Sequence, residues 1–173
     1  DGLETYNNLN SCYMQFEGSV GWSPTTETTP SNPYEALAQM ERYKEQGLSN
    51  DYSGINTFVL SWLIEKVTGQ RYTDVLETEI WQPMGAENDG LMLTPKRNTS
   101  AVFGGMSSTL RDMGRYGLLF TPSGPKGVIS EAHLEKIQKG GRPDLLKASE
   151  SLPMNIRLDG EKLTLIEAKV DGE

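Results

Sequence analysis

Residues 52–69 read Tyr-Ser-Gly-Ile-Asn-Thr-Phe-Val-Leu-Ser-Trp-Leu-Ile-Glu-Lys-Val-Thr-Gly, and this stretch decides the fold. Its apolar residues recur at helical spacing: Ile55, Val59, Leu60, Leu63, Ile64 and Val67. Gly69 follows the last of them, in the position after a helix where a left-handed residue is favoured. The stretch therefore predicts an amphipathic helix that begins just after Tyr52 and ends at Gly69.

Tyr52 stands at the start of this predicted helix. A helix start carries unpaired backbone N–H groups and a partial positive charge, which favour a phenolate over a phenol. A tyrosine in that place can act as a general base. An isolated tyrosine at a helix entrance is more often a capping or packing residue, so the local pattern leaves both interpretations open.

Three motifs follow one another along the chain. The first combines Tyr52, Gly54, Asn56, Thr57, Leu60 and Trp62 with Glu65, Thr68 and Gly69 at the helix end; the second is Trp81-Gln82-Pro83-Met84-Gly85-Ala86; the third comprises Gly104-Gly105, Thr109, Arg111-Asp112, Arg115 and Gly117. In this order and spacing they resemble the serine β-lactamase / DD-peptidase superfamily. Within it, the resemblance is to the esterases and 6-aminohexanoate-dimer hydrolases related to class C β-lactamases, and it extends from about the N-terminus to Gly141.

The resemblance implies a serine hydrolase that cleaves an ester or amide bond through an acyl-enzyme and needs no metal or cofactor. The nucleophile would be the serine of a Ser-x-x-Lys motif that precedes the tyrosine. The sequence matches that motif once, at Ser123-Gly124-Pro125-Lys126, which follows Tyr52 and whose proline and glycines favour a surface turn. A Lys-Thr-Gly or His-x-Gly strand is also absent, because Lys139-Gly140-Gly141 ends a predicted helix. We therefore expect the chain to be the middle portion of a longer hydrolase and inactive by itself.

The resemblance implies a catalytic role for Tyr52 and substrate-binding roles for Trp22, Tyr6 and Asn56. Trp22 lies in a Gly-Trp-Ser-Pro loop like the one that folds over the substrate in these hydrolases. It could equally be a loop aromatic packed on the protein body. For Tyr6, which no motif surrounds, a structural role is favoured.

Two positions depart from the family pattern. Gly54 stands where relatives often carry Ser or Asn, so a side-chain hydrogen bond to substrate or to the lysine is lost. Phe103 precedes the Gly104-Gly105 pair where several relatives carry a polar residue. The Arg111-Asp112-x-x-Arg115 block could be a carboxylate site. A structural role is favoured, since an Asp in a first helical turn offsets the helix dipole and can pair with both arginines.

Composition and charge narrow the partners. The 173 residues are 36% hydrophobic and 23% charged, enough for one domain with a core. The net charge of −8 argues against a nucleic-acid partner, and no apolar run is long enough to span a membrane. The lone Cys12 and the lone His133, which is set in a polar helix, argue against a disulfide or a zinc site. The sequence leaves compartment and oligomeric state undetermined.

We expect a mainly α fold: the helical portion of the β-lactamase/transpeptidase-like α/β fold, with a short β-hairpin near the C-terminus. The whole of 1–173 is expected to form a single domain. Its predicted parts are an active-site loop region at 1–32, a helical core at about 33–140 and a hairpin at 154–170. Within the core, helices are predicted from Asn32-Pro33 to Gln46, from Thr73 or Asp74 to Trp81, from a cap at Ser108 or Thr109 through Phe120 and from Ser130 to Lys139.

Two other classes of function stay open from the sequence. The chain could be a non-catalytic binding or interaction module that has kept the helical scaffold. It could also be a folded piece without activity of its own. A Ser-x-x-Lys motif encoded upstream of Asp1 would favour the hydrolase, and its absence would favour the binding module.

Overall fold

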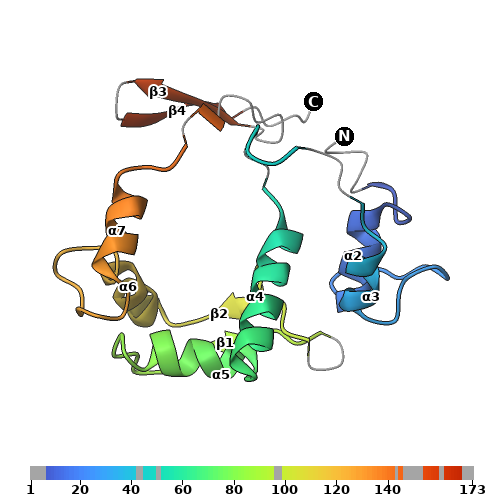
Figure 1. Cartoon of the computed structure of the whole chain (residues 1–173), viewed down its shortest axis with the longest axis horizontal. Coiled ribbons are helices and arrows are strands. Elements are labelled where there is room, and N and C mark those ends of the chain that lie inside the picture. Colours follow the sequence, from blue (N-terminus) through green and yellow to red (C-terminus); the bar gives the residue numbers. More distant parts are fainter. Residues whose placement is uncertain are drawn as a thin grey trace. The chain divides into compact units, whose positions relative to one another are not determined.

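The computed structural model describes most of the chain: residues 7–41, 45–49, 52–95, 99–142 and 144–145, and the backbone of 154–159 and 162–168. These residues group into two compact units. The first is formed by Asp1–Arg42 and Ser53–Gly141, and the second by Tyr43–Tyr52 and Arg142–Glu173. The single domain expected from the sequence stays a prediction. The mainly helical fold with one C-terminal hairpin is confirmed (Figure 1).

The first unit begins with two short helices, α2 (Cys12–Val20) and α3 (Pro33–Ala38). Ser11 caps α2 by accepting a hydrogen bond from the N–H of Met14, and Gly21 ends it with a φ of 92°. The loop expected at 1–32 is therefore wrong for residues 12–20, because the apolar side chains of α2 enter the core. Tyr6 lies outside the described residues.

Helix α3 begins as the sequence predicts and ends early. Asn32 accepts a hydrogen bond from the N–H of Glu35 at 3.0 Å, and Glu35 accepts one from the N–H of Ser31 in return. The helix was expected to reach Gln46, but it stops at Ala38. At its end, the N–H groups of Gln39 and Met40 donate hydrogen bonds to the carbonyls three residues earlier, a pattern that is common in the last turn of a helix.

Helix α4 (Gly54–Thr68) is the long helix predicted from residues 52–69, and Gly69 ends it with a φ of 70°. Its buried residues are Gly54, Phe58 and Ser61, whereas Leu60, Leu63 and Val67 are exposed. These three apolar residues, whose spacing helped to predict the helix, therefore lie outside the core. The side of α4 that carries Phe58 is the one covered by other elements.

A core of aromatic and aliphatic side chains joins α2, α3 and α4. Phe16, Val20, Ala36 and Phe58 are its buried members, and Leu37, Met40, Ile55, Val102 and Phe103 pack against them. The Phe16 and Phe58 rings meet edge to face with 5.3 Å between their centroids, an arrangement that aromatic pairs favour. This core fixes where α4 begins.

Helix α5 (Tyr72–Leu76) runs directly into the π-helical turn η1 (Glu77–Trp81), in which the N–H of Gln82 bonds to the carbonyl of Glu77. The short strands β1 (Leu91–Met92) and β2 (Met106–Ser107) pair antiparallel. At Gly105 an added Cβ would lie 2.7 Å from Ala101, so the expected close approach of two backbones is confirmed there.

Helices α6 (Leu110–Leu118) and α7 (Glu131–Gln138) complete the first unit. Thr109 and Ser130 cap them as expected. Among the apolar side chains of α6 and its C-cap, Leu119 is buried, whereas Leu110, Met113 and Leu118 are exposed. On α7, Leu134 is half-buried and Ile137 exposed.

The hairpin of the second unit consists of β3 (Met154–Asp159) and β4 (Lys162–Ala168), within the predicted 154–170. Their antiparallel register runs from Met154 opposite Ala168 to Asp159 opposite Lys162, with one irregularity between Asn155 and Ile156. No helix in the described part of the chain is long and apolar enough to cross a membrane.

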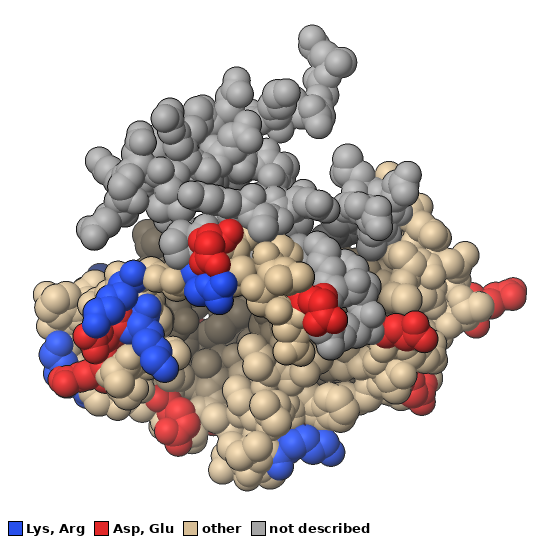
Figure 2. Space-filling view, turned by 45° about the horizontal axis from the view of Figure 1, so that its top comes forward, with Lys and Arg blue, Asp and Glu red and all other residues tan. Residues whose placement is uncertain are grey.

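The described surface carries charges of both signs. Figure 2 shows acidic and basic side chains close to one another over part of one face. Exposed ion pairs such as Arg71–Asp74 at 2.6 Å and Lys139–Glu135 at 2.5 Å are of this kind. Pairs this exposed contribute little to stability. The expectation that nucleic acid does not bind rests on the net charge and stays a prediction.

Candidate functional site

The start of α4 is partly covered, because Gly54 is buried and Ser53 is half-buried. Ser53 occupies the capping position in extended geometry, with a φ of −148° and a ψ of 115°, but its side chain makes no capping hydrogen bond. Tyr52 precedes it with 79% of its surface exposed, and Asn56 is exposed in the first turn. The capping residue therefore supplies no side-chain partner for the backbone N–H groups and the partial positive charge of this helix start.

Phe103 connects this helix start to the loop that carries Trp22. An added Cβ on Gly54 would lie 3.2–3.4 Å from the Phe103 side chain, so the two residues are packed against each other. Phe103 in turn meets Trp22, with 5.5 Å between ring centroids, and Phe16, with 5.8 Å. Trp22 remains 42% exposed, so it contacts the protein body and still presents a face to solvent.

The four site residues predicted from the sequence are placed differently in the structure. Phe103 contacts both Trp22 and Gly54, which lies in the helix turn that carries Asn56. Phe103 stands where several relatives carry a polar residue. Tyr52 is exposed and directly precedes Ser53 in the chain. Tyr6 lies outside the described residues. The roles of all four stay predictions.

The Ser123-Gly124-Pro125-Lys126 match lies in the turn between α6 and α7, as expected. The Lys126 ammonium donates to the carbonyl of Pro122 at 2.9 Å, and Ser123 is exposed. At Gly124 an added Cβ would lie 1.9 Å from the Leu118 carbonyl oxygen, so the turn is packed closely against the end of α6. Lys126 is thus engaged with its own turn, which supports the rejection of this match as a catalytic pair.

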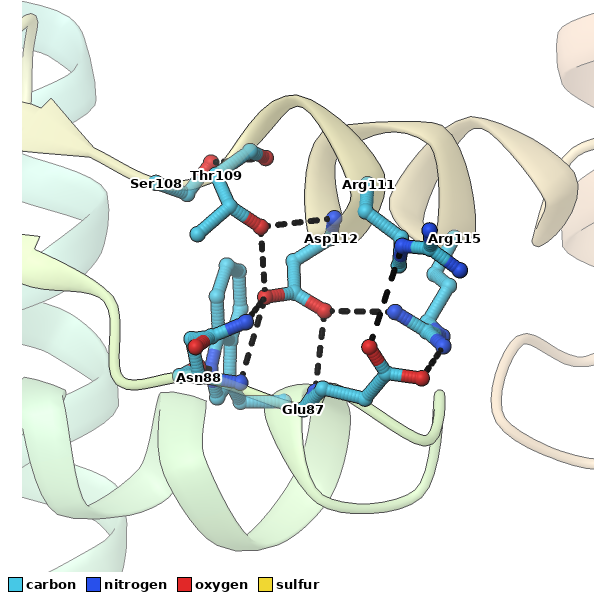
Figure 3. A network of polar contacts seen from close by, with 8 residues as sticks. Glu87, Asn88, Ser108, Thr109, Arg111, Asp112 and Arg115 are labelled. Atoms are coloured by element: carbon cyan, nitrogen blue, oxygen red, sulfur yellow. Dashed lines mark hydrogen bonds and ion pairs between the residues drawn. The ribbon is translucent and has the colours of Figure 1, made fainter.

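Several hydrogen bonds converge on the side chain of Asp112 (Figure 3). Its buried carboxylate accepts hydrogen bonds from the backbone N–H of Glu87 at 2.9 Å and of Asn88 at 3.2 Å. The Asn88 amide at 3.1 Å, the Thr109 hydroxyl at 2.8 Å and the Arg115 guanidinium at 2.9 Å complete the set. This network fastens the turn after η1 to the start of α6.

These donors stabilise the ionised form of Asp112. The backbone N–H of Glu87, followed by the Thr109, Asn88 and Arg115 side chains, holds the pKa of Asp112 well below its usual range, although burial acts in the opposite direction. The structural interpretation of the Arg111-Asp112-x-x-Arg115 block is thereby supported. Arg111 differs from the expectation, because its ion pair, at 3.8 Å, is with Glu87.

Among the described residues, no three or more His, Cys, Asp or Glu side chains come together in a group that could hold a metal ion. Cys12 is exposed and unpaired with another cysteine, and His133 is exposed on α7. That the protein needs no cofactor stays a prediction.

Sequence reasoning missed one group of polar residues. Tyr34, Ser61, Glu65 and Tyr72 line a common hollow beside α4. The residues are separated by up to 38 positions along the chain, so no local motif brings them together. The available signal was Glu65, a carboxylate in an otherwise apolar and aromatic stretch.

Comparison with known proteins agrees with the sequence motifs. The β-lactamase family matches residues 18–158. The 6-aminohexanoate-dimer hydrolase of Paenarthrobacter ureafaciens is 31% identical over 144 residues, which cover 82% of this chain and 36% of that protein. The solved structure of a putative 6-aminohexanoate-dimer hydrolase from Bacillus anthracis superposes with a TM-score of 0.66 at 23% identity, over 76% of this chain and 35% of that one.

These matches extend over most of this chain, whereas the chain spans about a third of the length of the two relatives. The likeness to the solved structure establishes the fold. The family match and the sequence identity establish kinship with β-lactamase-like hydrolases. The chain belongs to the β-lactamase family.

Proposed function

We propose that this chain is the portion of a serine hydrolase that carries the proton-transfer tyrosine, and that the intact protein cleaves an ester or amide bond of a small molecule. The observation that carries the proposal is the exposed Tyr52 at the uncapped start of α4. Membership of a hydrolase family supports the reaction class.

In the proposed mechanism, a serine and a lysine of the intact protein lie outside this chain. The serine oxygen attacks the substrate carbonyl, and the serine proton is taken up into a hydrogen bond that the lysine and Tyr52 share. Tyr52 then delivers that proton to the leaving group, which departs and leaves an acyl-enzyme. Water hydrolyses the acyl-enzyme and restores the serine.

The surroundings of Tyr52 suggest how substrate is held. Trp22 presents an exposed face beside Phe103, and both are apolar, so we propose that they cover a non-polar part of the substrate. Gly54 and Phe103 replace polar residues of the family pattern. Fewer hydrogen bonds to the substrate follow, and Asn56 remains as a polar side chain of the first turn.

The decisive experiment is Tyr52→Phe in the complete protein, with p-nitrophenyl esters as substrates. Loss of a general acid–base group lowers kcat by about 10²-fold or more. Because the ring is kept in Tyr52→Phe, the denaturation midpoint should barely change. A structural tyrosine would give normal kcat with lowered stability, and that result would remove Tyr52 from the mechanism.

The 173-residue chain alone provides the matched control. It should not hydrolyse these esters above background, and a serine-directed fluorophosphonate should leave it unlabelled. Stoichiometric labelling of Ser123 would overturn both the proposal and the rejection of the 123–126 match. A complete protein that also resists labelling would favour the non-catalytic binding module.

A further inference from the structure

A hollow of about 180 Å³ lies beside α4. The polar residues that line it come from α3, α4, α5 and the segment after residue 98: Tyr34, Ser61, Glu65, Tyr72, Thr99 and Ser100. Glu65 is eleven residues beyond Gly54, which corresponds to about 16 Å along the helix axis. The Glu65 end of the hollow is therefore distant from the start of α4, whereas Phe58 and Val102 line the end nearer to it.

Glu65 gives this hollow its charge. Among the described residues that line it, Glu65 is the one with a carboxyl side chain. One carboxylate oxygen accepts a hydrogen bond from the backbone N–H of Tyr72 at 2.9 Å, which holds the side chain in place at the start of α5. Burial, and next the negative charge of Glu65, raise the pKa of the Tyr34 hydroxyl, so the field of the carboxylate reaches that wall.

Aromatic rings stand next to this carboxylate. Tyr34 meets Trp62 with 4.9 Å between ring centroids and Phe58 with 5.7 Å. A second, wider hollow of about 610 Å³ shares Tyr34 and Glu65 and adds Trp62 to its lining. Ring faces attract cations electrostatically, and a carboxylate beside them adds to that attraction.

Hydroxyl groups supply acceptors around the same space. Ser61 donates its proton to the Phe58 carbonyl at 2.7 Å, so its oxygen lone pairs remain able to accept a hydrogen bond. Thr99 and Ser100 add two more hydroxyl oxygens to the lining. A primary ammonium group has three N–H donors and no acceptor, which matches one carboxylate and several hydroxyl oxygens.

We propose that the hollow lined by Tyr34, Ser61, Glu65 and Ser100 binds the primary ammonium group of a small aliphatic amine. A hollow of about 180 Å³ has room for an ammonium with a short alkyl chain. The wider hollow is less suited to the ammonium because Lys66 and Arg71 line it, although Arg71 is paired with Asp74. The alkyl chain can extend toward Trp62.

The test is titration of the complete protein with n-butylammonium, followed by calorimetry and by ligand-observed NMR. Sodium chloride at about 0.15 M suppresses unspecific attraction of cations to acidic surface, which this chain contributes with its net charge of −8. Neutral n-butanol and anionic butyrate serve as probes of the same length. We expect n-butylammonium to bind at least about tenfold more tightly than either, because a charge-assisted contact is lost with both.

Glu65→Gln is the decisive variant. The glutamine keeps an oxygen for the Tyr72 N–H and loses the charge, so the fold contact is preserved while n-butylammonium should bind about tenfold more weakly or worse. Glu79→Gln is the matched control, because Glu79 is an exposed carboxylate of η1 that lines neither hollow. Its affinity for the amine should equal that of the unchanged protein.

Tyr34→Leu tests the aromatic wall independently of the charge and should also weaken the amine without affecting n-butanol. Tetramethylammonium separates charge from hydrogen bonding, and it should bind more weakly than n-butylammonium because it has no N–H group. Equal binding of n-butanol and n-butylammonium, an unchanged Glu65→Gln protein, or an equal loss in Glu79→Gln would each overturn the proposal.

Discussion

The aromatic core of α2, α3 and α4 and the polar network around Asp112 both join separate elements of the fold. The core does so through burial of apolar side chains, and the network through hydrogen bonds to a charged group. In the core, Phe16 and Phe58 join separate helices through burial and ring contact. In the network, one carboxylate of α6 joins that helix to the turn at residues 87–88 through three accepted hydrogen bonds, and two more come from Thr109 and Arg115. The core tolerates changes of shape poorly, whereas the network depends on charge state, so the two regions should respond differently to mutation and to pH.

The largest effect should come from truncation in the core. Phe58→Ala removes a ring that is 3% exposed and contacts Phe16 and Tyr34. Loss of a buried Phe side chain and the resulting cavity should lower the free energy of unfolding by about 3–5 kcal/mol. Chemical denaturation of the 173-residue chain measures it. A loss below about 1 kcal/mol would mean that these helices are held by something other than this core.

Next in size is Asp112→Asn, which replaces one acceptor oxygen by an amide that faces the donors of the network. The protein should be destabilised less than by Phe58→Ala, since the side chain keeps its volume. Thermal unfolding at neutral pH measures the difference. A more stable variant would contradict the role given to the carboxylate.

The pH dependence of that difference separates charge from shape. The pKa of Asp112 is lower in the folded chain than in the unfolded chain, where it is about 4. Its stabilising contribution is therefore complete above about pH 4 and is lost as the pH falls from there toward the folded value. The stability gap between the protein and Asp112→Asn should narrow over that range. The gap for Phe58→Ala should stay constant, and equal narrowing in both would refute the contrast.

A smaller effect is expected from Thr109→Ala. The Thr109 side chain accepts from the N–H of Asp112 at 3.1 Å and donates to its carboxylate at 2.8 Å. Loss of the cap should cost about 1 kcal/mol, and Thr109→Ser should restore most of it because the hydroxyl is kept. Equal losses in both variants would assign the effect to the methyl group.

The smallest effect should come from Leu63→Ala on the exposed side of α4. Leu63 is 56% exposed, so its truncation should change the free energy of unfolding of the 173-residue chain by less than about 0.5 kcal/mol. A loss of about 2 kcal/mol or more would show that this side is covered after all. Phe58→Ala and Leu63→Ala together compare the two sides of one helix.

The sequence predicted local features well where one or two residues control them. The caps at Asn32, Thr109 and Ser130 and the helix end at Gly69 were all located correctly, because a side chain near a helix end or a glycine with positive φ acts on its own turn. Helix α2 was missed because its flanking residues are rich in Asn, Ser and Gly. The helix is stabilised by Phe16 and Val20, which pack against residues that are distant in the sequence.

By itself the sequence determined the family, the mainly helical fold, the hairpin and the identity of Tyr52 as the residue to test. Those depend on ordered motifs and on local backbone preferences. The tertiary structure decided which side of α4 is buried, since helical periodicity offers several apolar faces and the partner selects one. It also decided that Phe103 joins Gly54 to Trp22 and that Asp112 receives donors from residues 87–88. Contacts between residues far apart in the chain depend on how the elements pack, which no local pattern encodes.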